Sequence, residues 1–349
     1  MESCDLLIIG AGPIGIAAAI QAKRENLNAI ILDKGVVVNT IYNFPTNMTF
    51  FTTANLLEIG GHPFPSTGSK PTRQMALDYY RLIVQNEALD VRTYHHVTSV
   101  EGGEGEFTIG GKHTFPSGKD PEDFKFHAKY VMIATGYFDN PNGLDVPGAD
   151  LPHVHLYYKE PHEFFRQNVV IIGAGNSGAE ASLELFRFGA KVTLVHNQPM
   201  PKATVKYWVA PDLNNRLKAR QIEPVMPANV TEITRDSVIA EYEGKSIEIP
   251  ADTVFVFTGF TPDTSFFKSL GIDLEEDGKV IITKYFESNR DGLFVIGSAA
   301  FGKYTNSVFI ENGRVHAKDA VGEISRRLKD QNYTPDKSPS TVVIRPTNI

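Results

Sequence analysis

An α/β fold of two Rossmann-like dinucleotide-binding domains, one inserted into the other, is predicted from three features of the sequence. Two glycine-rich turns, at residues 10–15 and 173–178, each join a short apolar strand to a helix rich in small residues. Two later strands, at 130–136 and 253–259, each end in a Thr-Gly step after one of these turns. With 349 residues, 42% of them hydrophobic, the chain is long enough to bury two cores.

The first glycine turn predicts a dinucleotide site. It reads Gly10-Ala11-Gly12-Pro13-Ile14-Gly15 and follows the apolar strand DLLII. Gly10 permits a tight turn, Gly12 lets the backbone approach a pyrophosphate, and Gly15 permits close packing of helix on strand. Pro13 suits the first helical position, where its missing N–H would be unpaired anyway. The next strand, NAIILDK, ends at Asp33, whose carboxylate would accept hydrogen bonds from an adenosine ribose.

The second glycine turn predicts another dinucleotide site with different coenzyme selectivity. It reads Gly173-Ala174-Gly175-Asn176-Ser177-Gly178. The matching second strand, KVTLVHN, carries His196 and Asn197 where the first site has its carboxylate. Without a carboxylate a ribose 2′-phosphate is not repelled, and His196, Asn197, Lys202 and Lys206 are able to donate hydrogen bonds to it. We therefore predict NADPH rather than NADH, the alternative being that both lysines are solvated loop charges.

The order of these elements favours a nested arrangement. A strand in DGLFVIG and a helix in SVFIENGRVHAKDAVGEISRRL follow the second Thr-Gly step and would complete the first domain. The expected FAD-binding domain therefore consists of residues 1–157 and 264–349, and the NADPH-binding domain of residues 158–263.

Composition and charge exclude several classes of function. The chain has 34 basic and 41 acidic residues, a net charge of −7, and lacks the basic field that nucleic acid or an anionic membrane requires. No apolar run approaches the roughly 18 residues of a membrane span, and the first residues lack the cationic segment of a signal peptide. We expect a cytoplasmic protein without membrane association. A single cysteine, Cys4, excludes an intrachain disulfide and a cysteine metal cluster, and the histidines lack metal-ligand spacing, so no metal is expected.

With these features in place, the chain resembles flavoproteins of the thioredoxin-reductase-like group nearly end to end. Within that group it is most similar to the bacillithiol disulfide reductase family. The segments that carry this resemblance are TIYNFPTNMTFF, SKPTRQMALDYYR, VPGADLPHVHLYYKE, TVKYWVAPDL and VFIENGRVHA. The resemblance implies FAD and NADPH as cofactors and, as the reaction, reduction of the oxidised form of a low-molecular-weight bacterial thiol. It also implies a homodimer or homotetramer.

The resemblance and the motifs together indicate the binding residues, and the flavin itself is expected to be the reactive centre, with no catalytic side chain identified. The residues expected around FAD are Gly10, Gly12, Pro13, Ile14, Gly15, Asp33, Lys34, Tyr42, Thr49, Phe51, Val97, Ala134, Thr135, Gly136, Gly297, Ser298 and Ile310. Those expected around NADPH are Gly173, Gly175, Asn176, Ser177, His196, Asn197, Lys202, Lys206, Thr258 and Gly259. Ser298 stands where the wider flavoprotein pattern has aspartate, and its hydroxyl is still able to bond a ribityl hydroxyl.

Position 14 departs from the family pattern. Members commonly carry a cysteine there, the natural candidate for mixed-disulfide chemistry, and Ile14 has no thiol. Cys4 precedes the first strand on the side away from the turn and is a poor replacement. The leading prediction is therefore that hydride passes from NADPH to the flavin, and electrons then pass directly to a small disulfide without a protein cysteine.

Three other functions remain open at this stage. The electrons could go to a ferredoxin-like protein or a quinone, as in cysteine-free members of the same fold group. The segment LPHVHLYYKEPHEFFRQNVVIIGAGNSGAE also resembles flavin monooxygenases between their two glycine turns. Loss of the cysteine also invites a binding protein that senses the redox state of its cofactors without turnover. Reduction of the flavin by NADPH and the identity of the oxidant distinguish these functions.

Overall fold

The computed structural model describes residues 2–305 and 307–340, which form two compact α/β units. The first unit contains residues 2–140 and 261–340, and the second contains residues 141–260. One unit is thus inserted into the other, and the predicted fold class is confirmed. The chain passes between the two units at 140/141 and 260/261, whereas the expected domain boundaries are at 157/158 and 263/264. The first boundary comes earlier because the segment before residue 158 already belongs to the second unit. Its short strand β7 (Val154–His155) pairs in parallel with β14 (Thr253–Val256) of that unit.

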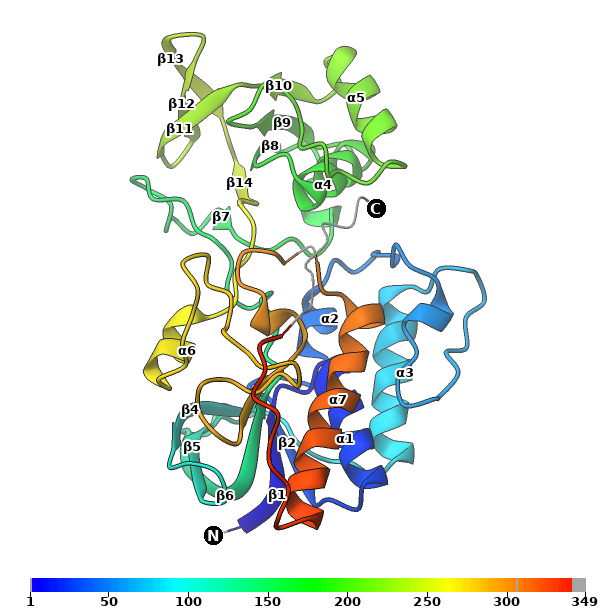
Figure 1. Ribbon diagram of the computed structural model, residues 1–349. Helices are drawn as coiled ribbons and strands as arrows, with labels where there is room; N and C mark the ends of the chain where they lie inside the picture. Colours follow the sequence, from blue (N-terminus) through cyan, green and yellow to red (C-terminus); the bar gives the residue numbers. More distant parts are fainter. Residues whose placement is uncertain (1, 306, 341–349) are drawn as a thin grey trace. The chain divides into compact units, whose positions relative to one another are not determined.

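A central sheet organises the first unit (Figure 1). Within the described residues it has seven strands, in the order β3-β2-β1-β6-β5-β4, with β15 also paired to β6. These strands are β1 (Glu2–Ile9), β2 (Ala29–Leu32), β3 (Asp90–Arg92), β4 (His95–Glu101), β5 (Phe107–His113), β6 (Glu122–Ile133) and β15 (Leu293–Val295). β1, β2, β3, β6 and β15 are mutually parallel where they pair, so their carboxyl ends meet at one edge, where ligands of such sheets bind.

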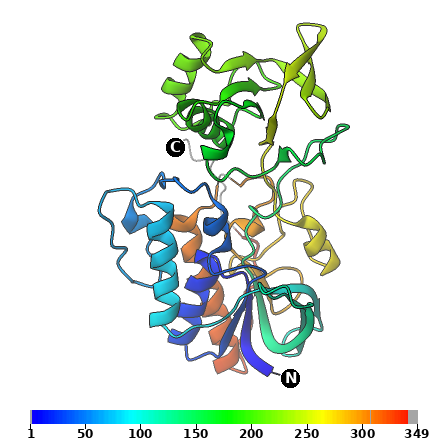
Figure 2. The ribbon, with the colours of Figure 1, turned by 180° about the vertical axis from the view of Figure 1, so that it is seen from behind.

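Helices cover one face of this sheet. α1 and α7, from opposite ends of the chain, lie side by side, with α3 next to them, in both Figure 1 and Figure 2. The helices of this unit are α1 (Pro13–Arg24), α2 (Asn39–Asn43), α3 (Arg73–Asn86), α6 (Thr264–Ser269) and α7 (Ile310–Lys329), with 3-10 turns η1 (Ala54–Leu56) and η3 (Gly297–Ala300). Pro13 begins α1, as the sequence predicts. Buried alanines along α1 allow its close approach to the sheet.

The second unit contains a parallel sheet and a small antiparallel one. Within the described residues, the parallel sheet has the order β10-β9-β8-β14-β7, and β11-β12-β13 form the antiparallel sheet. The remaining elements are η2 (His162–Phe164), β8 (Asn168–Ile172), α4 (Asn176–Arg187), β9 (Lys191–Val195), α5 (Ala210–Lys218), β10 (Glu223–Val225), β11 (Ala228–Ile233), β12 (Ser237–Tyr242) and β13 (Lys245–Pro250). The glycine turn 173–178 therefore joins β8 to α4, matching β1 and α1.

Two features are absent from the described part of the chain. No helix among residues 2–305 and 307–340 combines the length and the apolar character that a bilayer crossing requires. The same residues hold no group of three or more His, Cys, Asp or Glu side chains placed to bind a metal ion.

Candidate functional site

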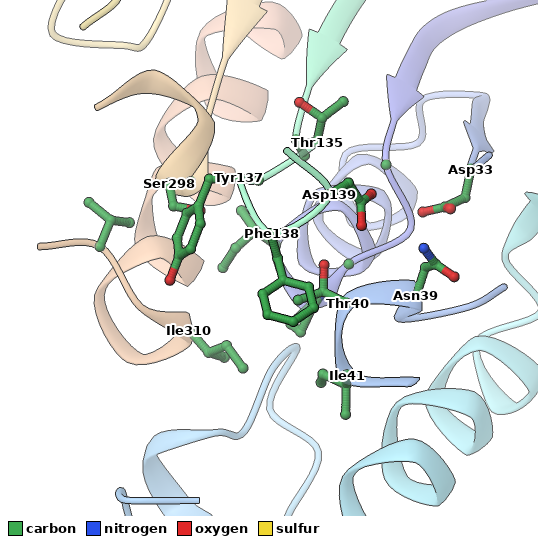
Figure 3. Close-up of a pocket in the computed structure, with 18 of the residues that line it drawn as sticks. Asp33, Asn39, Thr40, Ile41, Thr135, Tyr137, Phe138, Asp139, Ser298 and Ile310 are labelled. Carbon is green, nitrogen blue, oxygen red and sulfur yellow. The ribbon is translucent and has the colours of Figure 1, made fainter. Parts of the chain in front are cut away.

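A cavity of about 360 Å³ opens at the carboxyl edge of the sheet in the first unit, a volume typical of small-molecule sites. It extends from Asp33 and Asn39 on one side to Tyr137, Ser298 and Ile310 on the other (Figure 3). The predicted residues that line it are Gly10, Gly12, Pro13, Ile14, Asp33, Lys34, Phe51, Val97, Ala134, Thr135, Gly136, Gly297, Ser298 and Ile310. Most of the residues predicted for FAD therefore line this cavity.

The three glycines of the first turn have different physical roles. Gly10 has a φ of +113°, and a Cβ there would lie 2.6 Å from the carbonyl oxygen of Ala134. A Cβ at Gly15 would lie 1.9 Å from the carbonyl oxygen of Gly10. Gly12, in contrast, has an ordinary φ of −72°, and a Cβ there would meet no protein atom within 4 Å. Neither backbone nor packing requires glycine at position 12, so the open space in front of it suits a bound group such as a pyrophosphate.

The amino end of α1 is suited to an anion. Gly12 is its N-cap, no side chain caps its N–H groups, and its first turn has no acidic residue. Unpaired N–H groups at a helix start, with the positive end of the helix dipole, bind phosphate. This end lines the cavity through Gly12 and Pro13. The observed geometry therefore fits the pyrophosphate of a dinucleotide.

Asp33 is held rigidly at the other side of this turn. Its carboxylate oxygens accept hydrogen bonds from the N–H of Ala11 at 2.7 Å and of Gly35 at 2.8 Å. Burial raises the pKa of Asp33, although these two hydrogen bonds oppose the shift. Each oxygen keeps a lone pair for a further donor. Asp33 is therefore placed to accept hydrogen bonds from ribose hydroxyls.

Ile14 packs into a notch between two glycines. Its side chain would lie 3.4 Å from a Cβ at Gly297 and 3.1 Å from a Cβ at Gly313. Val308 borders the same notch, 3.2 Å from that second Cβ position. The aliphatic side chain of Ile14 thus fills the space left by the missing side chains of Gly297 on η3 and Gly313 on α7. Ile14 therefore forms part of the cavity wall, and its side chain has no redox-active group.

His316 supports this same wall from within α7. It is 7% exposed, its ring stacks on Phe286 with ring centroids 4.1 Å apart, and its Nδ1 accepts the N–H of Gly297 at 3.3 Å. Burial lowers the pKa of His316 to about 4. The imidazole is therefore neutral at pH 7 and acts as a hydrogen-bond acceptor for the backbone at the cavity edge.

This burial predicts a pH-dependent loss of stability. In the unfolded chain a histidine titrates near 6.5, so below that pH the unfolded state binds the proton first and stability falls until about pH 4. The shift corresponds to roughly 3 kcal/mol lost across this window. Urea unfolding of wild type and His316→Gln at pH 7 and pH 4.5 should show a smaller acid loss in the variant. Equal losses in both proteins would contradict the assignment.

Some predicted residues lie outside the cavity lining. Gly15 serves packing, as described above. Tyr42 is 49% exposed, with the Arg73 guanidinium 5.6 Å from its ring centroid, and Thr49 forms an isolated β-bridge with Thr72. Tyr42 lies on α2, and the preceding residues of this helix, Asn39, Thr40 and Ile41, line the cavity.

The structure also adds residues that the sequence analysis did not name. Those lining the cavity include Asn39, Thr40, Ile41, Phe44, Met48, Phe50, His95, His96, Tyr137, Phe138, Asp139, Asp263, Phe309 and Glu311. Tyr137, Phe138 and Asp139 directly follow the first Thr-Gly step. A chain that leaves the carboxyl end of a central parallel strand passes along the edge where ligands bind. The Thr-Gly step at the end of this strand could therefore have predicted that the residues after it line the cavity.

Cys4 has no access to this cavity. It lies within β1, is 6% exposed, and its Sγ faces the carbonyl oxygen of His127 at 3.7 Å. Along the strand it is about 16 Å from Ile9 at roughly 3.3 Å per residue. Burial raises the pKa of its thiol to about 12, so the reactive thiolate is scarcely populated at neutral pH. The single cysteine of the chain is therefore structural.

The second glycine turn repeats the geometry of the first. Gly173 has a φ of +110°, and a Cβ at Gly178 would lie 1.9 Å from the carbonyl oxygen of Gly173. Gly175 has an ordinary φ of −85°, and the nearest atom to a Cβ there is Lys202 Cδ at 3.8 Å. Gly175 also begins α4 without a side-chain cap. This turn likewise leaves open space in front of an uncapped helix start.

The other residues predicted for the second site gather around this turn. Asn176 fixes the following loop, because its side chain donates to the carbonyl oxygen of Thr204 at 3.1 Å and accepts the N–H of Lys206 at 2.9 Å. The N–H of Lys202 donates to Ala174 at 3.0 Å, and Lys206 Nζ pairs with Glu180 at 2.5 Å. Ser177 is exposed at the start of α4, His196 and Asn197 follow β9, and Thr258 and Gly259 follow β14. All belong to the carboxyl edge of one sheet.

His196 is the unusual member of this group. It is 5% exposed, and its Nε2 is buried without a hydrogen-bond partner in the described part of the chain. Burial, with Lys202 nearby, lowers its pKa. Buried polar atoms are nearly always paired, so an orphaned nitrogen beside a nucleotide turn suits a side chain whose partner is a bound molecule.

Comparison with known proteins gives consistent matches over most of the chain. Residues 7–297 match the family model described as pyridine nucleotide-disulphide oxidoreductase. The chain is 37% identical to bacilliredoxin reductase Bdr of Bacillus subtilis, over 92% of this chain and 97% of that protein. It is 25% identical to a ferredoxin–NADP reductase of Ignicoccus hospitalis, over 84% of this chain and 89% of that protein. The solved structure of bacillithiol disulfide reductase Bdr from Bacillus cereus matches with a TM-score of 0.89 and 36% identity, over 93% of this chain and 100% of that chain.

Proposed function

The chain belongs to the pyridine nucleotide-disulphide oxidoreductase family, and from this premise we propose that it is an FAD-dependent NADPH oxidoreductase that reduces a small disulfide, with bacillithiol disulfide as its leading substrate. One observation carries the cofactor part of this proposal. Gly12 and Gly175 each start a helix with ordinary backbone angles and open space at the Cβ position, as two dinucleotide sites require. The substrate is proposed from the relatives, whose names specify a bacilliredoxin and bacillithiol disulfide.

The residues of the first unit fit FAD. The amino end of α1 would hold the pyrophosphate, and Asp33 the adenosine ribose. Ser298 and Ile310 would contact the ribityl chain and the flavin ring at the opposite end of the cavity. When both cofactors are bound, NADPH supplies a hydride and FAD carries the electron pair to the acceptor. Apolar walls such as Phe51 and Ile14 exclude water around this end.

The residues of the second unit fit NADPH. The start of α4 would hold its pyrophosphate, and His196, Asn197 and Lys202 would contact its 2′-phosphate. The orphaned Nε2 of His196 supports this placement, because a phosphate oxygen would supply its missing partner. Lys206 is the weakest of the predicted phosphate ligands, since its ammonium group already pairs with Glu180.

A second candidate function is electron transfer to a ferredoxin-like protein or a quinone. The observation in its favour is that Ile14 occupies the turn and Cys4 is buried in β1, so no thiol of this chain reaches the cavity. Such an acceptor needs no protein thiol. A small disulfide, in contrast, would have to receive electrons directly at the flavin.

Rapid mixing tests both candidates. Flavin in the purified protein should be bleached by NADPH and then recolour on addition of bacillithiol disulfide at a rate that supports turnover. Recolouring only with a ferredoxin or quinone would select the second candidate. A flavin that NADPH does not bleach would exclude both.

If electrons pass directly from the flavin to the disulfide, no mixed disulfide between the protein and the substrate thiol should form. Wild-type protein incubated with NADPH and bacillithiol disulfide should gain no thiol adduct by intact-mass spectrometry, because its only thiol is buried and protonated. Ile14→Cys places a thiol in the turn and should gain one adduct of the expected mass. An adduct on wild type at Cys4 would contradict direct transfer.

A further inference from the structure

The titratable side chains that line the cavity are divided between its two ends. At the Asp33 end, Lys34 Nζ pairs with Asp139 at 3.3 Å, and His96 lies in the electrostatic field of Lys34 and Asp263. Figure 3 places Asp33 and Asp139 away from Ser298 and Ile310. Lys34 and Asp139 therefore form an ion pair beside the expected nucleotide part of the cofactor.

At the Ile310 end, the described titratable lining residues are Tyr137 and Glu311. Glu311 is the second residue of α7 and is half-buried. Within the described residues, no hydrogen bond or ion pair joins its carboxyl group to another side chain. A half-buried cavity carboxyl group that no described side chain hydrogen-bonds, and whose burial is opposed only in part by the charge of Arg314, is an unusual feature that the cofactor contacts above do not explain.

The polar groups that face Glu311 are engaged elsewhere. On α7 itself, the Arg314 guanidinium donates to the carbonyl oxygens of Glu58 and Asn55. On α3, the Tyr80 hydroxyl donates to the carbonyl oxygen of Leu57 at 2.8 Å. Burial raises the pKa of Glu311, with its own N–H and Arg314 opposing the shift only in part. Glu311 therefore keeps its proton to a higher pH than an ordinary glutamate.

Reduction of a disulfide requires such a proton. The balanced reaction is NADPH + H⁺ + RSSR → NADP⁺ + 2 RSH, in which the electron pair breaks the S–S bond. The hydride brings one of the two protons that the product thiols carry, and the other must be supplied. We propose that Glu311 donates this second proton to the leaving sulfur and is reprotonated from solvent. This inference rests on the proposed function.

Tyr137 is the alternative donor at this end. Burial raises the pKa of its phenol, which is already a much weaker acid than a carboxyl group. A proton donor is most effective when its pKa lies near the working pH. A carboxyl group with a raised pKa meets this condition better than a phenol with a raised pKa, which favours Glu311. Tyr137→Phe should therefore leave disulfide reduction far less affected than Glu311→Gln.

The test separates proton donation from electron transfer. Glu311→Gln keeps the size of the side chain and removes its acidic proton. With this variant, we expect unchanged bleaching by NADPH, unchanged recolouring by ferricyanide, which takes electrons without a proton, and about 100-fold slower recolouring by bacillithiol disulfide. Glu58→Gln is the matched control, because the Glu58 carboxylate accepts the N–H of Phe64 and lies outside this cavity. Its rates should equal those of wild type.

A second measurement does not depend on turnover. A ¹³C NMR titration of glutamate carboxyl groups in the FAD-bound protein should show one resonance with a raised pKa that Glu311→Gln removes. Equal disulfide rates in wild type and Glu311→Gln, or equal slowing with ferricyanide, would overturn the role of Glu311 while leaving the proposed function intact. Failure of wild type to reduce the disulfide would overturn the proposed function itself.

Discussion

Gly12→Val is expected to give a folded protein that binds FAD more weakly and is purified with less of it. The backbone at position 12 has angles that valine adopts readily, and its Cβ would meet no protein atom within 4 Å. The two methyl groups would instead fill the space in front of the α1 amino end, where we place the pyrophosphate. Overfilling a packed site costs about 1–3 kcal/mol or more, which corresponds to roughly 10- to 100-fold weaker binding.

Absorbance of the purified protein measures this result, since bound flavin is yellow. Gly103→Val is the matched control, because a Cβ at this exposed loop glycine also meets nothing within 4 Å, and this variant should retain FAD. Gly15→Val is the opposite control, because its Cβ would lie 1.9 Å from a backbone oxygen and the fold itself should fail. A Gly12→Val protein with normal FAD content would refute the assigned pyrophosphate site.

The contrast between these glycines shows what the sequence could predict. A glycine-rich turn between strand and helix is a local pattern, and its roles at Gly10 and Gly15 are set by backbone angles and contacts within a few residues. The family resemblance, read from segments spread along the chain, is confirmed by the comparisons. Local and family patterns together therefore predicted both glycine turns and the fold class.

What the sequence did not predict depends on contacts between distant segments. Glu311 reaches the cavity because α7, near the end of the chain, packs beside α1, near its start. His316 supports the cavity wall only because η3 and α7 are adjacent in space. Tyr42 lies near the Arg73 guanidinium because α2 and α3 pack against each other. No periodicity or spacing within one segment encodes these relations.

Position 14 links the fold to the question of the acceptor. Gly297 and Gly313 leave a notch that Ile14 fills, so replacing it by the smaller cysteine would leave part of the notch empty as well as adding a thiol. The aliphatic residue is therefore fitted to its neighbours. This fit is consistent with a site in which electrons leave the flavin directly and the acceptor lies against an inert wall.

Gly175→Val is expected to separate the two cofactor sites functionally. Valine adopts the φ of −85° found there, and the nearest atom to its Cβ is the flexible Lys202 side chain at 3.8 Å, so the fold and FAD binding should survive. Its methyl groups would occupy the space in front of α4 where we place the NADPH pyrophosphate, again weakening binding about 10- to 100-fold or more.

Two reductants distinguish this outcome from general damage. Dithionite does not need the nucleotide site and should bleach the flavin of Gly175→Val, wild type and the Gly103→Val control alike. NADPH at concentrations that saturate wild type should bleach the variant's flavin far more slowly, and raising the NADPH concentration should recover part of the rate. If NADPH reduced Gly175→Val as fast as wild type, the second turn would not be the NADPH site. NADPH would then have to bind at a different surface, and His196 would no longer be a candidate ligand of its 2′-phosphate.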